Sequence, residues 1–102
     1  MSGIKIVGID PGLAGTGIEV IEGNSKEICG YSFGSISTDV KDPIPFRLNR
    51  IYSKTLELLC KIQPEYVVIE DIFSLEKYPR SGIILGKVSG VLLLAAYKAG
   101  LD

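Results

Sequence analysis

The sequence predicts a single α/β domain built on a mixed β-sheet, with its elements in the order β-β-β-α-β-α. Three observations support this prediction. The first 38 residues consist of apolar and alternating runs, which are typical of strands. The hydrophobic period then changes to that of a helix, and a short apolar strand and an apolar helix follow. A chain of 102 residues suits one small domain, because a second would be too short to bury its own core.

The first three elements are expected to form an antiparallel meander. Residues 4–10, IKIVGID, are a largely apolar run that predicts a central strand buried on both faces. Residues 15–23 alternate apolar and polar side chains and end at Gly23-Asn24, a pair typical of turns. Residues 26–38 combine β-branched and aromatic residues with glycines, and we expect an edge strand there.

The change of period predicts an amphipathic helix between two proline-containing segments. Pro43 or Pro45 suits its first turn, and Pro64 ends it. Its apolar positions recur at helical spacing at Leu48, Ile51, Tyr52, Thr55, Leu58, Leu59 and Ile62. Charged side chains are expected mostly on the other face: Arg47, Arg50, Lys54, Glu57 and Lys61. Residues 66–71, YVVIED, predict a short buried strand, and an apolar helix is expected from about Ser81 to Lys98.

The composition argues against several classes of protein. The net charge is −1, with 11 basic and 12 acidic residues, so no overall basic field indicates a nucleic-acid partner, although a local patch would not show in this total. The chain has no His and no Cys-x-x-Cys pair, which argues against a zinc site. Cys29 and Cys60 are expected to be reduced thiols in the core of a soluble, cytoplasmic protein. No run reaches the roughly 20 apolar residues that a membrane span needs.

Two of the predicted strands end in carboxylates, at Asp10 and Glu70. A helical crossover precedes the second strand, which favours a parallel alignment with the first, and ligands of open α/β sheets gather at the carboxyl ends of strands. Neighbouring strands lie roughly 4.8 Å apart, so both carboxylates could share one magnesium ion. Each residue alone has a plainer explanation, as a turn former or a strand end, but together they favour a functional pair. Asp71 should point to the opposite face.

The glycines that follow Asp10 admit two interpretations. Gly12, Gly15 and Gly17 could let the backbone approach a phosphate, as glycine loops do. However, this loop opens a strand rather than a helix, and its spacing is not that of a GxxxxGK[ST] loop. A tight turn crossed closely by other backbone is therefore slightly favoured.

Four stretches resemble the RuvC-type Holliday junction resolvases of the ribonuclease H-like superfamily: GIDPGLAGTGI at 8–18, RLNRIY at 47–52, QPEYVVIEDIF at 63–73 and LGKVSGVLLLAA at 85–96. The resemblance covers nearly the whole chain. It implies a ribonuclease H-like mixed sheet and a magnesium-dependent endonuclease that nicks four-way DNA junctions in recombination and repair. It also implies a homodimer and a branch-migration helicase complex as a partner.

The same resemblance assigns roles to particular residues. Asp10 and Glu70 match two of the four carboxylates that hold the metals in this family, and are thereby implied to be catalytic. Phe73 matches an aromatic residue that contacts DNA near the crossover. Lys77, Arg80 and Lys87 are candidates for phosphate contacts, although a solvated loop and helix face explain them equally well.

The sequence also departs from the family pattern. It stops at Asp102, before the fifth strand and the C-terminal helix on which the family carries its other two carboxylates. We therefore expect residues 1–102 to form one C-terminally incomplete domain with weak or absent cleavage. Two alternatives remain: an actin-like or sugar-kinase-like phosphotransferase fragment that binds ATP through the glycine loop, and a non-catalytic domain that dimerises or binds DNA.

Gly86 and Gly90, four residues apart, predict a close contact of the second helix. Packing onto the sheet is the simpler explanation, whereas the family resemblance implies a dimer interface. A fourth strand with a free edge would offer a second route to a dimer.

Overall fold

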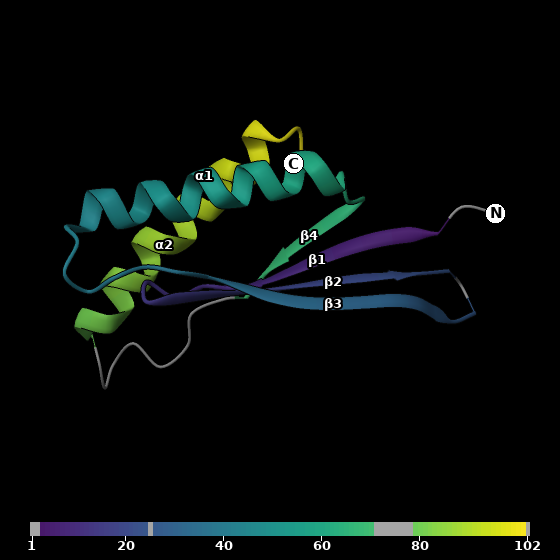
Figure 1. Ribbon diagram of the computed structural model, residues 1–102, viewed down its shortest axis with the longest axis horizontal. Helices are drawn as coiled ribbons and strands as arrows, with labels where there is room; N and C mark the ends of the chain where they lie inside the picture. Colours follow the sequence, from purple (N-terminus) through teal and green to yellow (C-terminus); the bar gives the residue numbers. More distant parts are fainter. Residues whose placement is uncertain (1–2, 25, 71–78, 102) are drawn as a thin grey trace.

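The computed structural model describes residues 3–24, 26–70 and 79–101. Four strands form one mixed sheet in the order β3-β2-β1-β4, and two helices cover one of its faces (Figure 1). The elements are β1 (Ile4–Asp10), β2 (Gly15–Gly23), β3 (Ile28–Ser37), α1 (Ile44–Ile62), β4 (Tyr66–Ile69) and α2 (Pro79–Lys98). The predicted α/β class and the order of its elements are confirmed.

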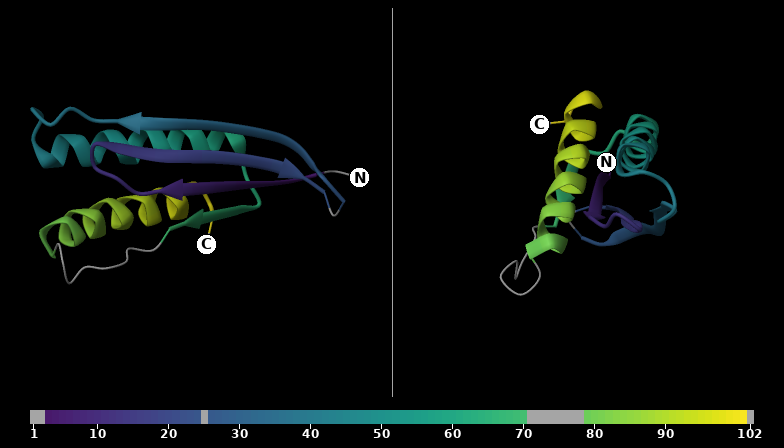
Figure 2. Two further views of the ribbon diagram at one scale, coloured as in Figure 1. Left: turned by 90° about the horizontal axis from the view of Figure 1, so that it is seen from below. Right: turned by 90° about the vertical axis from the view of Figure 1, so that its left-hand side faces the viewer.

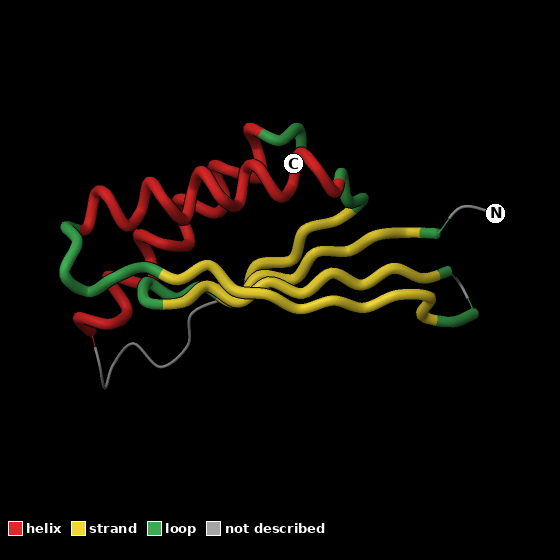
Figure 3. The backbone as a smooth tube through the Cα atoms, viewed as in Figure 1, coloured by secondary structure: helices red, strands yellow, loops and turns green. Residues whose placement is uncertain are grey.

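The sheet combines an antiparallel meander with one parallel strand. β1 pairs with β2 and β2 pairs with β3, both antiparallel, as predicted. At the turn between β2 and β3, the side-chain Oδ1 of Asn24 accepts hydrogen bonds from the backbone N–H groups of Lys26 and Glu27, at 2.8 and 3.0 Å. β4 pairs in parallel with β1, from Ile6 opposite Tyr66 to Ile9 opposite Ile69. β3 and β4 are therefore the two edges of the sheet, which Figure 3 shows as yellow strands beneath the red helices.

The core lies between the helices and one face of the sheet. Val7 and Ile9 of β1 pack there with Ile51 and Leu59 of α1 and with Val88, Leu92 and Ala96 of α2. Figure 2 shows both helices on the same side of the sheet. Side chains on the other face stay exposed, among them Tyr31, Phe33, Tyr66 and Val68. The expectation that the first strand is buried on both faces is wrong, because both helices cover the same face. The fourth strand was expected to be buried, but Tyr66 and Val68 are exposed for the same reason.

α1 has the predicted apolar stripe and one unexpected buried charge. Ile51, Thr55 and Leu59 are buried, as the spacing indicated. Arg47 was expected on the exposed face but is only 6% exposed. Its Nε donates a hydrogen bond to Oγ1 of Thr38 at 2.8 Å, which holds the first turn of the helix against the segment after β3.

Prolines mark both ends of α1, as predicted. Pro43 is the N-cap, and Pro45 lies in the first turn. The helix stops at Gln63, which has a left-handed backbone with φ of 51° and donates its N–H to the carbonyl of Leu59 at 2.8 Å. Pro64 follows directly and is buried. This left-handed C-cap reverses the chain direction, so that β4 can follow within a few residues.

Two further expectations are corrected. Cys29 and Cys60 are free thiols but are exposed, because they lie on the edge strand and on the outward side of α1. Gly86 and Gly90 are exposed as well, so packing onto the sheet does not explain them. α2 instead contacts the core through Val88 and residues at later turns. No helix within the described ranges is long and apolar enough to cross a membrane.

Candidate functional site

The structure brings Asp10 and Glu70 together at one end of the sheet. The last parallel pair is Ile9 with Ile69, and the next N–H, that of Glu70, donates to the carbonyl of Ile9 at 3.0 Å. Glu70 therefore continues alongside Asp10 in register. Because Ile9 is buried under the helices, strand alternation directs Asp10 to the open face of the sheet.

The two carboxylates repel each other. The negative charge of Asp10 raises the pKa of Glu70 above its usual value, and a side-chain hydrogen bond with Asp10 raises it further. Desolvation and the charge of Glu19 act in the same direction but less strongly. A cation between the two carboxylates would relieve this repulsion, and their oxygens are the ligands that magnesium prefers. The pair therefore fits a divalent cation.

Two residues that the sequence had not singled out join this pair. A hollow of about 240 Å³ is lined by Gly8, Ile9, Asp10, Gly17, Glu19, Phe33, Val68 and Glu70. Glu19 adds a third carboxylate, held at one oxygen by a 3.4 Å hydrogen bond from the Tyr31 hydroxyl. Phe33 lies opposite Glu19 on β3 and is 67% exposed. Within the described ranges, however, no three His, Cys, Asp or Glu side chains are grouped so as to hold a metal.

Gly17 explains how Phe33 reaches the carboxylates. It lies opposite Asp10 on β2, and a Cβ there would lie 3.6 Å from Cβ of Asp10 and 3.8 Å from the ring of Phe33. The absence of a side chain at Gly17 leaves this space open. The alternation of side chains along β2 predicts that Glu19 and Gly17 share a face. The pairing of Gly17 with Asp10 could not be predicted in this way, because it depends on the length of the turn between β1 and β2.

The loop between β1 and β2 is a tight turn. A Cβ at Gly12 would collide with the carbonyl oxygen of Gly15, so the backbone crosses itself too closely for a side chain. The hydroxyl of Thr16 closes the turn by donating to the carbonyl of Gly12 at 2.7 Å. Of the two interpretations of the glycines, close backbone contact accounts for Gly12 without a phosphate.

The remaining predicted site residues are placed less fully. Phe73, Lys77 and Asp71 lie outside the described residues. Arg80 belongs to the first turn of α2, but its side chain also lies outside the described part. Lys87 is exposed on α2 and is not among the residues that line the hollow.

Comparison with curated proteins places this geometry in a family. Residues 6–102 match the family model described as crossover junction endodeoxyribonuclease RuvC. A protein of that name from Magnetococcus marinus is 33% identical over 100 residues, which cover 98% of this chain and 55% of the relative. Another from Dehalococcoides mccartyi is 38% identical over 99 residues, covering 97% of this chain and 59% of the relative. The chain thus spans little more than half the length of these relatives.

Solved structures show the same relationship. The fold matches a structure described as T. thermophilus RuvC in complex with Holliday junction substrate, with a TM-score of 0.86 and 27% identity. The match covers 96% of this chain and 61% of that one. A second Thermus thermophilus RuvC structure gives a TM-score of 0.77 at 28% identity, with 96% and 60% covered. Sequence and fold agree over nearly all of its length: the chain belongs to the RuvC family of crossover junction endodeoxyribonucleases.

Proposed function

We propose that this chain contributes to a divalent-metal-dependent endonuclease that resolves four-way DNA junctions in recombination and repair. Membership of the RuvC family supports the activity and the substrate. The observation that carries the proposal is the adjacency of Asp10 and Glu70 at the ends of parallel neighbouring strands. This arrangement gathers negative charge where a cation would offset it, on an open face that DNA can approach.

Asp10 and Glu70 are the proposed metal ligands and catalytic residues, with magnesium as the cofactor. A divalent cation held there would supply charge stabilisation at a scissile phosphate and lower the pKa of an attacking water. The register of β1 with β4 positions the two carboxylates. Gly17 has no side chain, so the space beside them stays open. Phe73, Lys77, Arg80 and Lys87 are proposed to contact the DNA.

Residues 1–102 are proposed to form an incomplete ribonuclease H-like domain whose cleavage is weak or absent, because the two proposed ligands in the described part of the chain, Asp10 and Glu70, position two metal ions poorly. Cleavage of a labelled four-way junction by this chain should therefore be far slower than by a full-length relative. Cleavage at the full-length rate would contradict the proposed incompleteness.

Metal binding can be tested without cleavage. Mn²⁺, a paramagnetic substitute for Mg²⁺, should broaden the backbone amide signals around Asp10 and Glu70 in NMR spectra. Asp10→Asn should abolish this broadening, whereas Glu57→Gln, which removes an exposed carboxylate from α1, should leave it unchanged. Equal broadening in the wild type and in Asp10→Asn would contradict the proposed metal site.

A homodimer formed through α2 belongs to the same proposal. The outward side chains of α2 include four exposed apolar residues, Ile83, Leu93, Leu94 and Tyr97. Leu93→Glu should convert a dimer to a monomer in sedimentation experiments, whereas Ile28→Glu, at an exposed position on β3, should not. A wild-type chain that is monomeric at all concentrations would contradict this interface. Association with a branch-migration helicase complex, implied by the family resemblance, is likewise proposed.

A further inference from the structure

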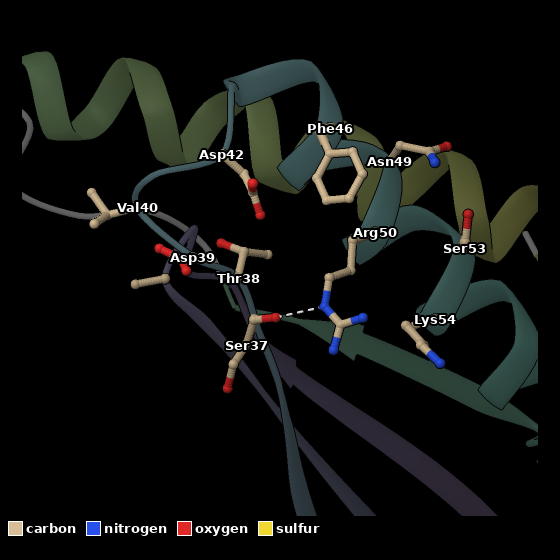
Figure 4. Close-up of a pocket in the computed structure, with 11 residues that line it drawn as sticks. Ser37, Thr38, Asp39, Val40, Asp42, Phe46, Asn49, Arg50, Ser53 and Lys54 are labelled. Atoms are coloured by element: carbon tan, nitrogen blue, oxygen red, sulfur yellow. Dashed lines mark hydrogen bonds between the residues drawn. The ribbon is translucent and has the colours of Figure 1, made fainter.

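A second concave surface lies at the same end of the sheet as the carboxylate hollow, but on the side of the sheet that α1 covers rather than on the open face. It is a groove of about 910 Å³ between the first turns of α1 and the segment that follows β3. Its basic side consists of Asn49, Arg50, Ser53 and Lys54, which lie on one side of α1 (Figure 4). Residues four apart share a helix face, so this sequence spacing concentrates two cations and two neutral polar groups there.

Arg50 is held in place by the sheet. Its Nε donates a hydrogen bond to the carbonyl oxygen of Ser37, the last residue of β3, at 2.7 Å. This bond uses one N–H of the guanidinium, and Figure 4 shows the rest of the group lying in the groove between Ser37 and Lys54. A guanidinium oriented in this way loses little conformational freedom when it binds a planar or tetrahedral oxyanion.

The groove is connected to the carboxylate site through a short loop. Ala14, four residues after Asp10, lines the groove, and its carbonyl accepts the N–H of Thr38 at 3.0 Å. The hydroxyl of Thr38 donates to the carbonyl of Leu13 and accepts from the buried Arg47. The loop after Asp10, the end of β3 and the start of α1 are thus fixed to one another. A ligand in the groove would have a defined position relative to the carboxylates.

The opposite side of the groove carries Asp39 and Asp42. The backbone N–H of Lys41 donates to Oδ1 of Asp39 at 2.9 Å, so this carboxylate has a local role in the turn. The two acids leave the groove with a basic side and an acidic side rather than a uniform charge. A polyanion is therefore expected to run along the α1 side, past Arg50 and Lys54.

We propose that Arg50 and Lys54 bind the phosphodiester backbone of a DNA strand, at a position separate from the phosphate that faces Asp10 and Glu70. This inference rests on the proposed function for the identity of the ligand and adds a contact that orients the DNA relative to the carboxylates. A contact to phosphate oxygens fixes the position of the DNA backbone and carries no sequence information of its own.

The test is the binding of a fluorescein-labelled four-way DNA junction, followed by anisotropy in EDTA over a range of salt concentrations. Arg50→Gln combined with Lys54→Gln should weaken binding about tenfold or more and reduce the slope of log Kd against log[salt] by about 2, one for each lost phosphate contact. The matched control is Lys61→Gln with Lys98→Gln, which removes the same charge from the last turns of the two helices. Equal losses in both double variants, or no loss in the first, would overturn the proposal. So would a wild-type chain that does not bind the junction at low salt.

Two further variants test the geometry. Asp39→Asn with Asp42→Asn should strengthen binding, because it removes the opposing charge from the same groove. Arg50→Lys keeps the charge but removes the guanidinium group, whose Nε donates the hydrogen bond to Ser37. This variant should therefore bind the junction more weakly than the wild type and more tightly than Arg50→Gln. If Arg50→Lys binds like Arg50→Gln in spite of its charge, or if the acidic variant weakens binding, the proposed contact is wrong.

The Nε–Hε signal of Arg50 provides a direct readout in NMR spectra. It should shift on addition of the junction, whereas the corresponding signal of the buried Arg47 should stay in place. The measurement needs no metal, so its outcome is independent of the metal site. Mn²⁺ broadening at Asp10 with no shift at Arg50 would contradict only the proposed DNA contact in the groove. A shift at Arg50 with no Mn²⁺ broadening at Asp10 would contradict only the proposed metal site.

Discussion

The tight turn after Asp10 can be tested by adding a single methyl group. In Gly12→Ala the new Cβ would approach the Gly15 carbonyl oxygen more closely than real side chains do, and it would lie 3.3 Å from the carbonyl carbon. The obstacle is backbone, so no side chain can rotate away and the turn itself must open. Overpacking of this kind costs about 1–3 kcal/mol. For a domain of this size, such a loss corresponds to a fall in melting temperature of roughly 4–24 °C.

Gly15→Ala is the matched control, because nothing lies within 4 Å of a Cβ at that position. Gly15 is in β2, so alanine there should leave stability unchanged or raise it slightly. Thermal unfolding followed by circular dichroism compares the two variants directly. Gly12→Ala should also weaken Mn²⁺ broadening around Asp10, because the displaced turn begins at that residue. Equal melting temperatures for the two variants would refute the steric argument.

The remaining predictions concern the carboxylate pair, the buried arginine and the core. Glu70 holds its proton more tightly in the folded chain, so its contribution to stability is full below pH 4.5, its usual pKa, and is lost as pH rises through the raised value. Asp10→Asn should lower the pKa of Glu70 toward its usual value in a ¹³C NMR titration, and an unchanged pKa would show that Asp10 is not the cause. Arg47→Leu should cost about 1.5–3 kcal/mol in urea unfolding through the lost bond to Thr38; an equal loss in a Thr38→Val background would show that this bond is not responsible. Leu59→Ala should cost about 2–5 kcal/mol, because Leu59 is only 1% exposed, and a cost near zero would contradict its place in the core.

The fold was predictable because its elements have strong local signals. The alternation in residues 15–23, the helical spacing from Leu48 to Ile62 and the prolines around α1 each depend on neighbouring residues alone. The adjacency of Asp10 and Glu70 needed one further rule, that a helical crossover aligns the flanking strands in parallel. Each of these inferences used short-range pattern or general topology.

The features that were missed depend on long-range contacts. Arg47 lies at a position where a charge is normally solvated, and its burial follows from the hydroxyl of Thr38 reaching it from another segment. Glu19 and Phe33 join the carboxylates because a particular turn length pairs Gly17 with Asp10. The exposed thiol of Cys29 likewise follows from the position of β3 at the edge of the sheet. No periodicity in the sequence predicts these contacts between distant segments.

The parallel pairing of β1 with β4 has a consequence for the order in which the domain assembles. It joins residues 60 positions apart, and at its far end the N–H of Lys5 donates to the carboxylate of Glu65 at 2.8 Å. The hairpins and α1 close short loops, whereas β4 and α2 both reach β1 across 60 or more residues, so we expect these two elements to dock late. Asp10 and Glu70 then meet late in folding. A cation that requires both carboxylates would slow unfolding of the finished domain without speeding its folding.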